Sequence, residues 1–447
     1  MDGTLTGQLW YRVHRRRATG GTAPLPRPGV FGHNKACMHG LLQYLRPTRA
    51  AGRRRSSTAL CREGWGYLVL VAAIFGLAVS RDVNLLFVLA GLLVGPLVFS
   101  WRLAVRTLDG LDVRRRVPHG ICAGDLLVVN LDLSNPRRRT GSWTVVVQDQ
   151  IQREGTTRPG EPLRPEVLFS YVPAGQSSTG VYRGRLPRRG RYRFGPLTLS
   201  TRFPFGLIRR TVVLEQPDAL LVYPRPGRLT RRWVVRHREA FEGSQRREQR
   251  YGRMSGDFYG VRPWRQGDSR RWIHWRSSAR HGTLVVRQFE RFRSRDMAVL
   301  VDLWQPAEPA QPGLEHLENV ELAVSFAATV VDDVCRRGSG DLWLGIAGRQ
   351  RQWVTGPASG IVLQDAMETL ALAEAASEDG LPELLDEALR QVGPGAEVVL
   401  VSTRPVDLRD GERFAAFQGN PAWRAMVGQI RLVNTAAEEL ADYFEAE

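Results

Sequence analysis

Lysine is almost absent from this sequence: Lys35 is the single lysine, so arginine supplies 62 of the 63 basic residues. The four cysteines lie far apart and form no CxxC pair, which excludes a disulfide-framework module and a cysteine zinc site. The chain also lacks a GxxxxGK phosphate-binding loop, an HExxH motif and a GxSxG motif. Because no pattern requires enzymatic turnover, we expect no catalytic residue, no cofactor and no enzyme.

Length and composition describe a folded protein whose charge is unevenly distributed. The 447 residues are 43% hydrophobic and 24% charged, which excludes a wholly disordered chain and predicts about two to four domains. The formal net charge is +18, but residues 302–447 contain 10 arginines and 25 acidic residues. The chain therefore has a basic and an acidic part, and the basic part suits nucleic acid, anionic lipid or the acidic part itself.

The most apolar stretch, residues 65–101, predicts a hairpin of two membrane-spanning helices. Residues 80–84 (SRDVN) interrupt it, and each arm approaches the ~20 apolar residues that cross a bilayer. A buried soluble hairpin is the alternative, which we disfavour because neither arm has a polar face. Arginines flank both outer ends, so both chain termini are expected on the cytoplasmic side. We assign residues 64–105 to this hairpin.

The regions on either side of the hairpin differ in pattern. Residues 1–63 are basic, and their Gly-, Pro- and Arg-rich beginning predicts a disordered tail, with translation starting at Met1 or Met38. Residues 106–225 contain short β-rich runs, such as LLVVNLDLSN and SWTVVVQDQI, separated by turn residues. Such spacing predicts an immunoglobulin-like β-sandwich, with most of its arginines on a solvated face.

Residues 226–295 form a segment in which two aspartates, three histidines and four tryptophans alternate with arginines. Three interpretations stay open. The segment is a structural or partner-binding strap, a nucleic-acid surface with arginine on phosphates and tryptophan on bases, or an acid–base site with His274 and either Asp257 or Asp268. We favour the strap, because both aspartates follow a glycine, as in turns where aspartate caps backbone amides.

This segment resembles the signature of the domain-of-unknown-function 58 family of bacterial membrane proteins. The resemblance covers roughly residue 46 onward and includes the apolar helices and the stretch RRGRYRFGPLTLSTRFPFGLIRR. The matching signature residues are GDFY at 256–259, RPW at 262–264, GDS at 267–269, Arg271, IHW at 273–275, SAR at 278–280, Leu284 and Arg287. The candidate interaction residues are Gly256, Asp257, Tyr259, Arg262, Trp264, Gly267, Asp268, Arg271, His274, Trp275, Ala279 and Arg280.

Residues 296–447 alternate buried strands with helices, which predicts a doubly wound α/β domain that ends in an acidic helix. In the resembling family this domain is similar to a von Willebrand factor type A domain, which often holds Mg²⁺ on a D-x-S-x-S loop. Asp302 stands at the aspartate position, but residues 303–306 (LWQP) include neither serine, and Thr403 adds at most one oxygen. We expect a degenerate metal position that binds no metal tightly.

The missing catalytic motifs and the flanking arginines lead us to expect a non-enzymatic protein of the bacterial inner membrane with its soluble domains in the cytoplasm. The resemblance implies a protein partner, a MoxR-type AAA+ ATPase, in chaperone-like assembly or envelope-related processes. The alternative is a membrane-tethered binder of nucleic acid or another anionic polymer, which the basic first part of the chain favours and which we rank second. The client and the oligomeric state stay open.

Overall fold

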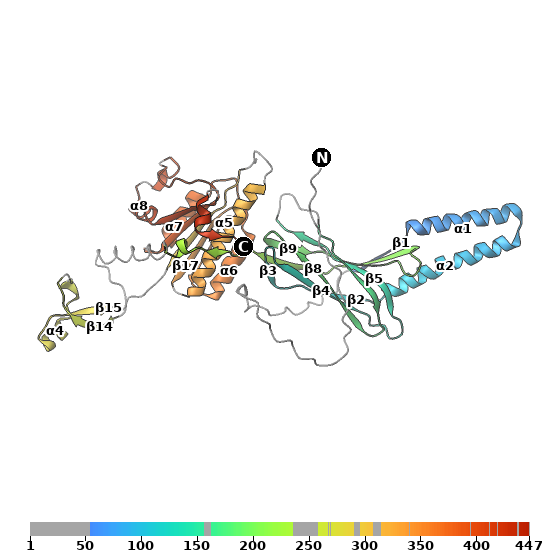
Figure 1. The fold of residues 1–447 in the computed structure, drawn as a ribbon, viewed down its shortest axis with the longest axis horizontal. Helices are drawn as coiled ribbons and strands as arrows, with labels where there is room; N and C mark the ends of the chain where they lie inside the picture. Colours follow the sequence, from blue (N-terminus) through green and yellow to red (C-terminus); the bar gives the residue numbers. More distant parts are fainter. Residues whose placement is uncertain are drawn as a thin grey trace. The chain divides into compact units, whose positions relative to one another are not determined.

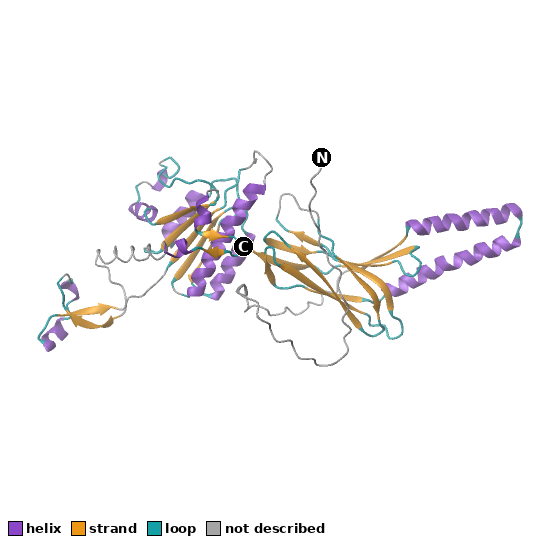
Figure 2. Ribbon diagram, viewed as in Figure 1, coloured by secondary structure: helices purple, strands orange, loops and turns teal. Residues whose placement is uncertain are grey.

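The computed structural model describes residues 54–155, 162–235, 258–289 except 267 and 269, 296–306, and 314–446 except 339, 394, 411, 418, 436 and 437. The chain divides into two compact units, Met1–Tyr223 and Pro224–Glu447. Residues 1–53 of the expected tail, and Gly256, Asp257 and Gly267 of the expected signature, lie outside the described residues. The multidomain layout with two apolar helices and several sheets is confirmed (Figures 1 and 2).

Three sheets surround one hydrophobic core in the first unit. The five-stranded sheet has the order β1 (Arg54–Leu60), β11 (Ile208–Leu214), β10 (Leu197–Thr201), β5 (Ser142–Gln148) and β7 (Glu166–Val172). The four-stranded sheet has the order β3 (Gly120–Cys122), β12 (Asp218–Tyr223), β9 (Gly190–Phe194) and β6 (Ile151–Arg153). The three-stranded sheet has the order β2 (Asp112–Arg116), β4 (Leu126–Ser134) and β8 (Ser177–Arg185). Alternate residues of β4 are buried, the period-2 pattern of a strand with one face on a core. The immunoglobulin-like assignment stays a prediction.

Strand β1 lies in a region where we expected a disordered tail. Residues 54–60 pair antiparallel with β11 over seven positions, from Arg54 opposite Leu214 to Leu60 opposite Ile208. Six of its seven side chains are exposed. An edge strand is held by backbone hydrogen bonds and needs no apolar pattern of its own, which is why the sequence carries so little sign of it.

Helices α1 (Arg62–Arg81) and α2 (Asn84–Leu108) are long and apolar enough to cross a membrane, by length and composition. They lie side by side, and the Tyr67 hydroxyl of α1 donates to the Leu93 carbonyl of α2 at 2.8 Å. Only 11% of the apolar window of each helix is buried. A core helix of a soluble protein would bury far more of its apolar surface, so this exposure agrees with the hairpin expected at residues 64–105.

The last turn of α2 is fixed to the sheets by side chains that satisfy its terminal carbonyls. A helix leaves its last carbonyls without intrahelical partners. The Arg137 guanidinium donates to two of them, and Ser142 Oγ donates to the Thr107 carbonyl at 2.9 Å. Arg54 Nη2 donates to the Leu108 carbonyl at 2.9 Å. The hairpin and the sheets of the first unit are therefore joined by hydrogen bonds and not by a linker.

An ion pair lies inside the core of the first unit. The side chains of Arg115, on β2, and Asp149, after β5, are both fully buried. Arg115 Nη2 is 2.6 Å from Asp149 Oδ1, and the Tyr182 hydroxyl of β8 donates to Asp149 Oδ2 at 2.6 Å. Burial raises the pKa of Asp149, while the charge of Arg115 and the hydrogen bond from Tyr182 act in the opposite direction. The pair thus links two sheets. Because both side chains are buried, water cannot solvate either charge if the other is removed.

The second unit contains a five-stranded sheet of the expected α/β kind. Its order is β18 (Gln352–Pro357), β17 (Asp341–Ala347), β16 (Met297–Asp302), β19 (Glu397–Ser402) and β20 (Ile430–Asn434). Four strands are parallel, and β18 is an antiparallel edge. All six residues of the central strand β16 are buried, as in sheets covered on both faces.

Helices cover both faces of this sheet (Figure 2). Helices α7 (Leu381–Gln391), α8 (Pro421–Val427) and η2 (Ala415–Phe417) share a core with Ala298 and Leu300 of β16. The alternate β16 residues are also fully buried, on the side where α5 (Leu314–Arg337) packs against β16 and α6 (Gly360–Leu372). The similarity to a von Willebrand factor type A domain stays a prediction.

Residues 224–235 pack on the α/β body, although we expected residues from 226 onward to belong to the signature segment 226–295. Strand β13 (Arg228–Leu229) pairs with the terminal strand β21 (Phe444–Glu445), which follows η3 (Glu438–Asp442) where we expected a closing helix. Trp233 is 1% exposed and makes edge-on ring contacts with Phe326 and Tyr443. Burial of the large Trp233 ring attaches residues 226–235 to the α/β body. Their basic composition, which resembles that of the signature residues, does not indicate this.

The signature forms a separate small hairpin. Strand β14 (Phe258–Pro263) pairs antiparallel with β15 (Val285–Phe289), and the connection contains η1 (Arg270–Trp272) and α4 (Trp275–His281). We call residues 258–289 the signature module.

Replacing Arg115 with methionine should open the core of the first unit. The variant leaves Asp149 buried without a countercharge, which costs about 3–5 kcal/mol. Hydrogen exchange in β2, β4 and β5 of the full-length protein in detergent should accelerate by about two orders of magnitude or more. Arg116→Met is the matched control, since Arg116 is 67% exposed and pairs with Asp132 at the surface, where a pair is worth below about 1 kcal/mol. Exchange that stays within tenfold of the wild type in the Arg115 variant contradicts this role.

Candidate functional site

The signature module holds its short helix against its hairpin through a few polar contacts. His274 is the N-cap of α4, and its Nδ1 accepts the Ser277 N–H at 3.2 Å. Ser278 Oγ accepts the Val285 N–H at 2.9 Å, and the His274 N–H donates to the Val285 carbonyl at 2.8 Å. These bonds tie α4 to β15, so the histidine and the serine of the signature have defined structural positions.

Asp268 closes the turn that comes after β14. Arg262 grips the carboxylate with two parallel bonds, Nη1 to Oδ2 at 2.7 Å and Nη2 to Oδ1 at 2.8 Å. The Arg265 N–H also donates to Oδ2, at 2.9 Å. The hydrogen bonds from Arg262 and from the Arg265 amide hold the pKa of Asp268 below its usual value. Both carboxylate oxygens are therefore engaged by the module itself, as expected for an aspartate that caps a turn.

The outer surface of the module is cationic and aromatic. Residues 258–289 contain seven arginines and one carboxylate, Asp268. Among the described residues of the module, Arg262 is the arginine with a carboxylate partner. Trp275, at the start of α4, is 67% exposed, and Leu284, directly before β15, is 46% exposed. The exposed arginines of this surface are Arg265, Arg270, Arg271, Arg276, Arg280 and Arg287.

The structure separates the candidate signature residues into two groups. Arg262, Asp268 and His274 make the internal bonds described above, and the Trp264 amide donates to the Leu284 carbonyl at 2.8 Å. The remaining described candidates have exposed side chains, except Tyr259, which is placed by its backbone alone. Arg271, Trp275, Ala279 and Arg280 are exposed, and Tyr259 lies on β14. The signature thus combines residues that build the module with residues that it presents.

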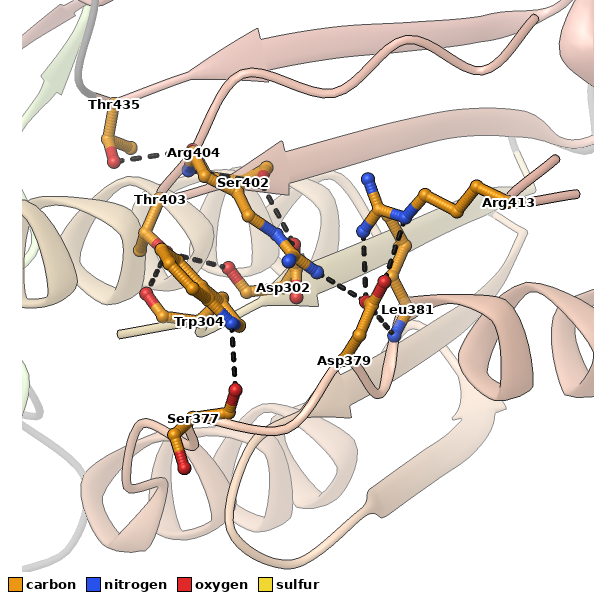
Figure 3. Close-up of polar contacts among 10 residues, drawn as sticks. All are labelled: Asp302, Trp304, Ser377, Asp379, Leu381, Ser402, Thr403, Arg404, Arg413 and Thr435. Carbon is orange, nitrogen blue, oxygen red and sulfur yellow. Dashed lines mark hydrogen bonds and ion pairs between the residues drawn. The ribbon is translucent and has the colours of Figure 1, made fainter. Parts of the chain in front are cut away.

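A second cluster lies at the carboxyl ends of β16 and β19 (Figure 3). Asp302 ends β16, is 2% exposed, and accepts a hydrogen bond from Ser402 Oγ at 3.0 Å. Arg404 Nε donates to Asp302 Oδ2 at 3.1 Å, and its Nη2 pairs with Asp379. The guanidinium carbon of Arg404 lies 4.9 Å from the centre of the Trp304 ring. This position is where ligands bind in doubly wound sheets.

Two further groups complete the cluster. Arg413 donates to both oxygens of Asp379, at 2.8 and 2.9 Å. Burial acts to raise the pKa of Asp379, but the hydrogen bonds from Arg413 and Arg404 outweigh it, so the pKa lies below its usual value. Thr403 Oγ1 donates to the Trp304 carbonyl at 2.6 Å. Both oxygens of Asp379 are therefore engaged by arginine, and the Thr403 hydroxyl is directed at the Trp304 carbonyl.

These contacts do not fit a divalent cation at the degenerate metal position. Mg²⁺ needs near-octahedral oxygen ligands. The oxygen of Asp302 that accepts from Ser402 also accepts from Arg404, whose charged group occupies the side of the carboxylate that faces Asp379. Burial raises the pKa of Asp302, and the charge of Arg404 counters that effect. Among the described residues, no group of three or more His, Cys, Asp or Glu side chains is placed to hold a metal.

Sequence reasoning missed Arg404, Asp379 and Arg413. Arg404 directly follows Thr403 after the expected strand. Its place at the carboxyl end of that strand is the signal from which it could have been predicted. Asp379 lies in a loop 25 residues before Arg404, and nothing in the local pattern indicates that the two side chains meet.

Residues 260–404 match the sequence model described as "Protein of unknown function DUF58". The uncharacterized protein YeaD of Bacillus subtilis (strain 168) is 26% identical over 287 residues, which cover 62% of this chain and 67% of YeaD. The resemblance to the domain-of-unknown-function 58 family is thereby confirmed. The matched residues include nearly all of the signature module and the cluster around Asp302 up to Arg404, and Arg413 lies beyond them.

Three solved structures show weak likeness. The CARDB domain of a Pyrococcus furiosus protein, in complex with di-metal ions, has a TM-score of 0.16 and 12% identity over 25% of this chain and 91% of its own. Superoxide reductase from Ignicoccus hospitalis has a TM-score of 0.18 and 14% identity over 25% and 80%. Spo0M, the sporulation control protein of Bacillus subtilis, has 0.16 and 10% over 35% and 58%. TM-scores this low do not define a shared fold.

Calorimetric titration of the full-length protein with Mg²⁺ or Mn²⁺ should show no binding in the micromolar range. The reason is that a cation at Asp302 would have to displace the buried charge of Arg404. Asp302→Ala is the matched variant and should leave the titration unchanged. Micromolar binding that the Asp302 variant abolishes would show that this position is a metal site after all.

Proposed function

We propose that this chain is a non-enzymatic membrane protein whose signature module binds a protein partner on the cytoplasmic side. The observation that carries the proposal is the outer surface of the module, which presents an exposed tryptophan together with exposed arginines that have no carboxylate partner among the described residues. Arginine and tryptophan are the residue types that contribute most to protein interfaces. A surface of this composition suits a partner with an acidic, partly apolar patch.

The contacts of the acidic and basic side chains support a binding role over a catalytic one. Both oxygens of Asp268 are engaged by Arg262 and the Arg265 amide, and Nδ1 of His274 caps α4. A general base needs a lone pair within reach of the proton that it takes. Asp268 and His274 instead use their acceptors to build the module.

The partner that we propose is a MoxR-type AAA+ ATPase, on the strength of the family resemblance. The inner membrane and the cytoplasmic orientation follow from the arginines that flank both ends of the hairpin, such as Arg62 and Arg106. In this arrangement the helices anchor the chain, and the module and the α/β domain face a cytoplasmic partner. Chaperone-like assembly or envelope-related processes are the setting that the family resemblance implies.

An anionic polymer is the second candidate, favoured by the same surface. Arginines could neutralise phosphates, and Trp275 could stack on a base. The two candidates differ in salt dependence, because polynucleotide binding falls steeply with ionic strength through counterion release.

Neutralising the surface arginines of the module should weaken binding of a purified MoxR-type ATPase to the full-length protein in nanodiscs. The test variant replaces Arg270, Arg271, Arg276 and Arg280 with glutamine. The matched control makes the same charge change on the first unit, at the exposed residues Arg183, Arg185, Arg188 and Arg191. We expect at least a tenfold loss of affinity, about 1.4 kcal/mol, for the module variant and no loss for the control.

Equal losses in both variants would point to unspecific charge attraction, and no measurable binding of the wild type would reject the ATPase. Tight polynucleotide binding that weakens with salt, and whose salt slope falls in the module variant, would replace the leading proposal with the second candidate.

A further inference from the structure

The first unit carries exposed aromatic side chains that belong to its sheets but lie beside the helix hairpin. Residues 202–207 connect β10 to β11, and Phe205 in this turn is 57% exposed. Its ring lies 6.4 Å, centroid to centroid, from the ring of Phe99, a residue of α2 that is itself 55% exposed. Two exposed phenylalanines, one on the turn and one on a membrane-spanning helix, thus share one apolar surface.

The turn is held at this level by the start of α1. The Cys61 N–H donates to the Leu207 carbonyl at 2.9 Å. Gly64, in the first turn of α1, approaches the same carbonyl so closely that an added Cβ would lie 2.2 Å from the oxygen. The Gly206 N–H closes the turn on the Arg202 carbonyl at 2.9 Å. The turn therefore cannot move away from the helices without breaking hydrogen bonds at the point where the chain enters α1.

The depth of Phe205 follows from its neighbour on α2. Phe99 lies eight residues before Thr107, whose carbonyl is bound by Ser142 of β5. With a rise of 1.5 Å per residue, this is about 12 Å along the helix. The turn thus reaches well past the junction of α2 with the sheets, toward the middle of the helix.

Other aromatic residues continue this surface. Trp143, on β5, is 48% exposed, and its ring stacks on Phe203 of the turn at 6.1 Å and packs on Tyr171 of β7 at 4.3 Å. On the helices, Trp65 is 60% and Trp101 is 51% exposed. Tryptophan and tyrosine collect at the boundary between lipid and water, where a ring with one polar edge is stable.

Exposed arginines accompany these aromatics. Arg62 begins α1, Arg202 begins the turn, and Arg102 follows Trp101 by one position on α2. Anionic headgroups attract such residues near the membrane surface. The apolar rings suit the acyl chains of a bilayer, and the cationic groups suit its anionic headgroups. An acidic protein surface would match the cationic groups but not the apolar rings.

We propose that the β10–β11 turn, residues 202–207, is a membrane-contact element in which Phe205 inserts into the leaflet that α1 and α2 enter and Arg202 contacts anionic headgroups. This rests on the membrane-spanning hairpin of the proposed function. The element fixes the sheets of the first unit at the bilayer surface, so the first unit is seated on the membrane as well as tethered to it.

The test places an environment-sensitive NBD fluorophore on one exposed cysteine of the full-length protein in vesicles of phosphatidylethanolamine and phosphatidylglycerol, since Cys61, Cys122 and Cys335 are buried. The probe positions are Phe205→Cys, Leu92→Cys and Leu126→Cys, each with Cys37→Ser. Leu92, on α2, reports insertion of the helices. Leu126 is the matched control, an apolar residue that is 51% exposed. It begins β4 and lies about 26 Å from Ser134, which ends the same strand.

We expect a blue-shifted emission at Phe205 that spin-labelled lipid quenches, as at Leu92, and no quenching at Leu126. Emission at Phe205 that matches Leu126 while Leu92 is quenched overturns the membrane-contact element but leaves the hairpin in place. A blue shift at Phe205 without lipid quenching means that a second copy of the chain covers the turn, and it too overturns the element. No quenching at Leu92 rejects the membrane hairpin and the element with it.

Replacing phosphatidylglycerol with phosphatidylcholine separates the two parts of the contact. The Phe205 signal should persist, whereas Arg202→Gln should weaken quenching only in the anionic vesicles. An Arg202 variant that behaves identically in both lipids overturns the headgroup contact.

Discussion

The last turn of α2 is the joint on which the arrangement of the first unit depends. Its terminal carbonyls are bound by Arg137 of the β4–β5 loop, Ser142 of β5 and Arg54 of β1. Unpaired carbonyls at a helix end would otherwise need water, which is scarce near lipid. Because the joint satisfies them with protein groups, the end of α2 is fixed relative to the sheets of the first unit. The aromatic turn beside Phe99 extends this joint.

Two arginines of this protein are fixed partners of buried carboxylates. Arg115 holds Asp149 in the core of the first unit, and Arg404 holds Asp302 at the edge of the second. The planar guanidinium makes several directed bonds at once, which a lysine ammonium cannot reproduce in the same geometry. The net charge of +18 therefore gives a poor guide to binding partners. The proposed function rests instead on the arginines of the signature module, among which Arg262 has a carboxylate partner within the described residues.

Patterns that reflect burial were readable from the sequence, and contacts between distant segments were not. The apolar run of residues 65–101 and the alternation in residues 296–447 predicted helices and an α/β sheet, because lipid and core both select apolar side chains over whole segments. Strand β1 escaped notice because backbone pairing leaves no apolar period. The ion pair between Arg404 and Asp302 joins residues 102 positions apart, so no local spacing in the sequence could have predicted it.

The central claim is that the hairpin crosses the membrane and leaves the sheets and the signature module on its cytoplasmic side. Labelling of single cysteines with a membrane-impermeant maleimide tests this most directly. The background is Cys37→Ser, in which the remaining Cys61, Cys122 and Cys335 are buried. In it we expect Ser80→Cys, in the last turn of α1 beside the hairpin turn, to react in intact spheroplasts. Arg183→Cys, exposed on β8, should react only after the membrane is opened. Labelling of the Arg183 variant in intact spheroplasts would contradict the account.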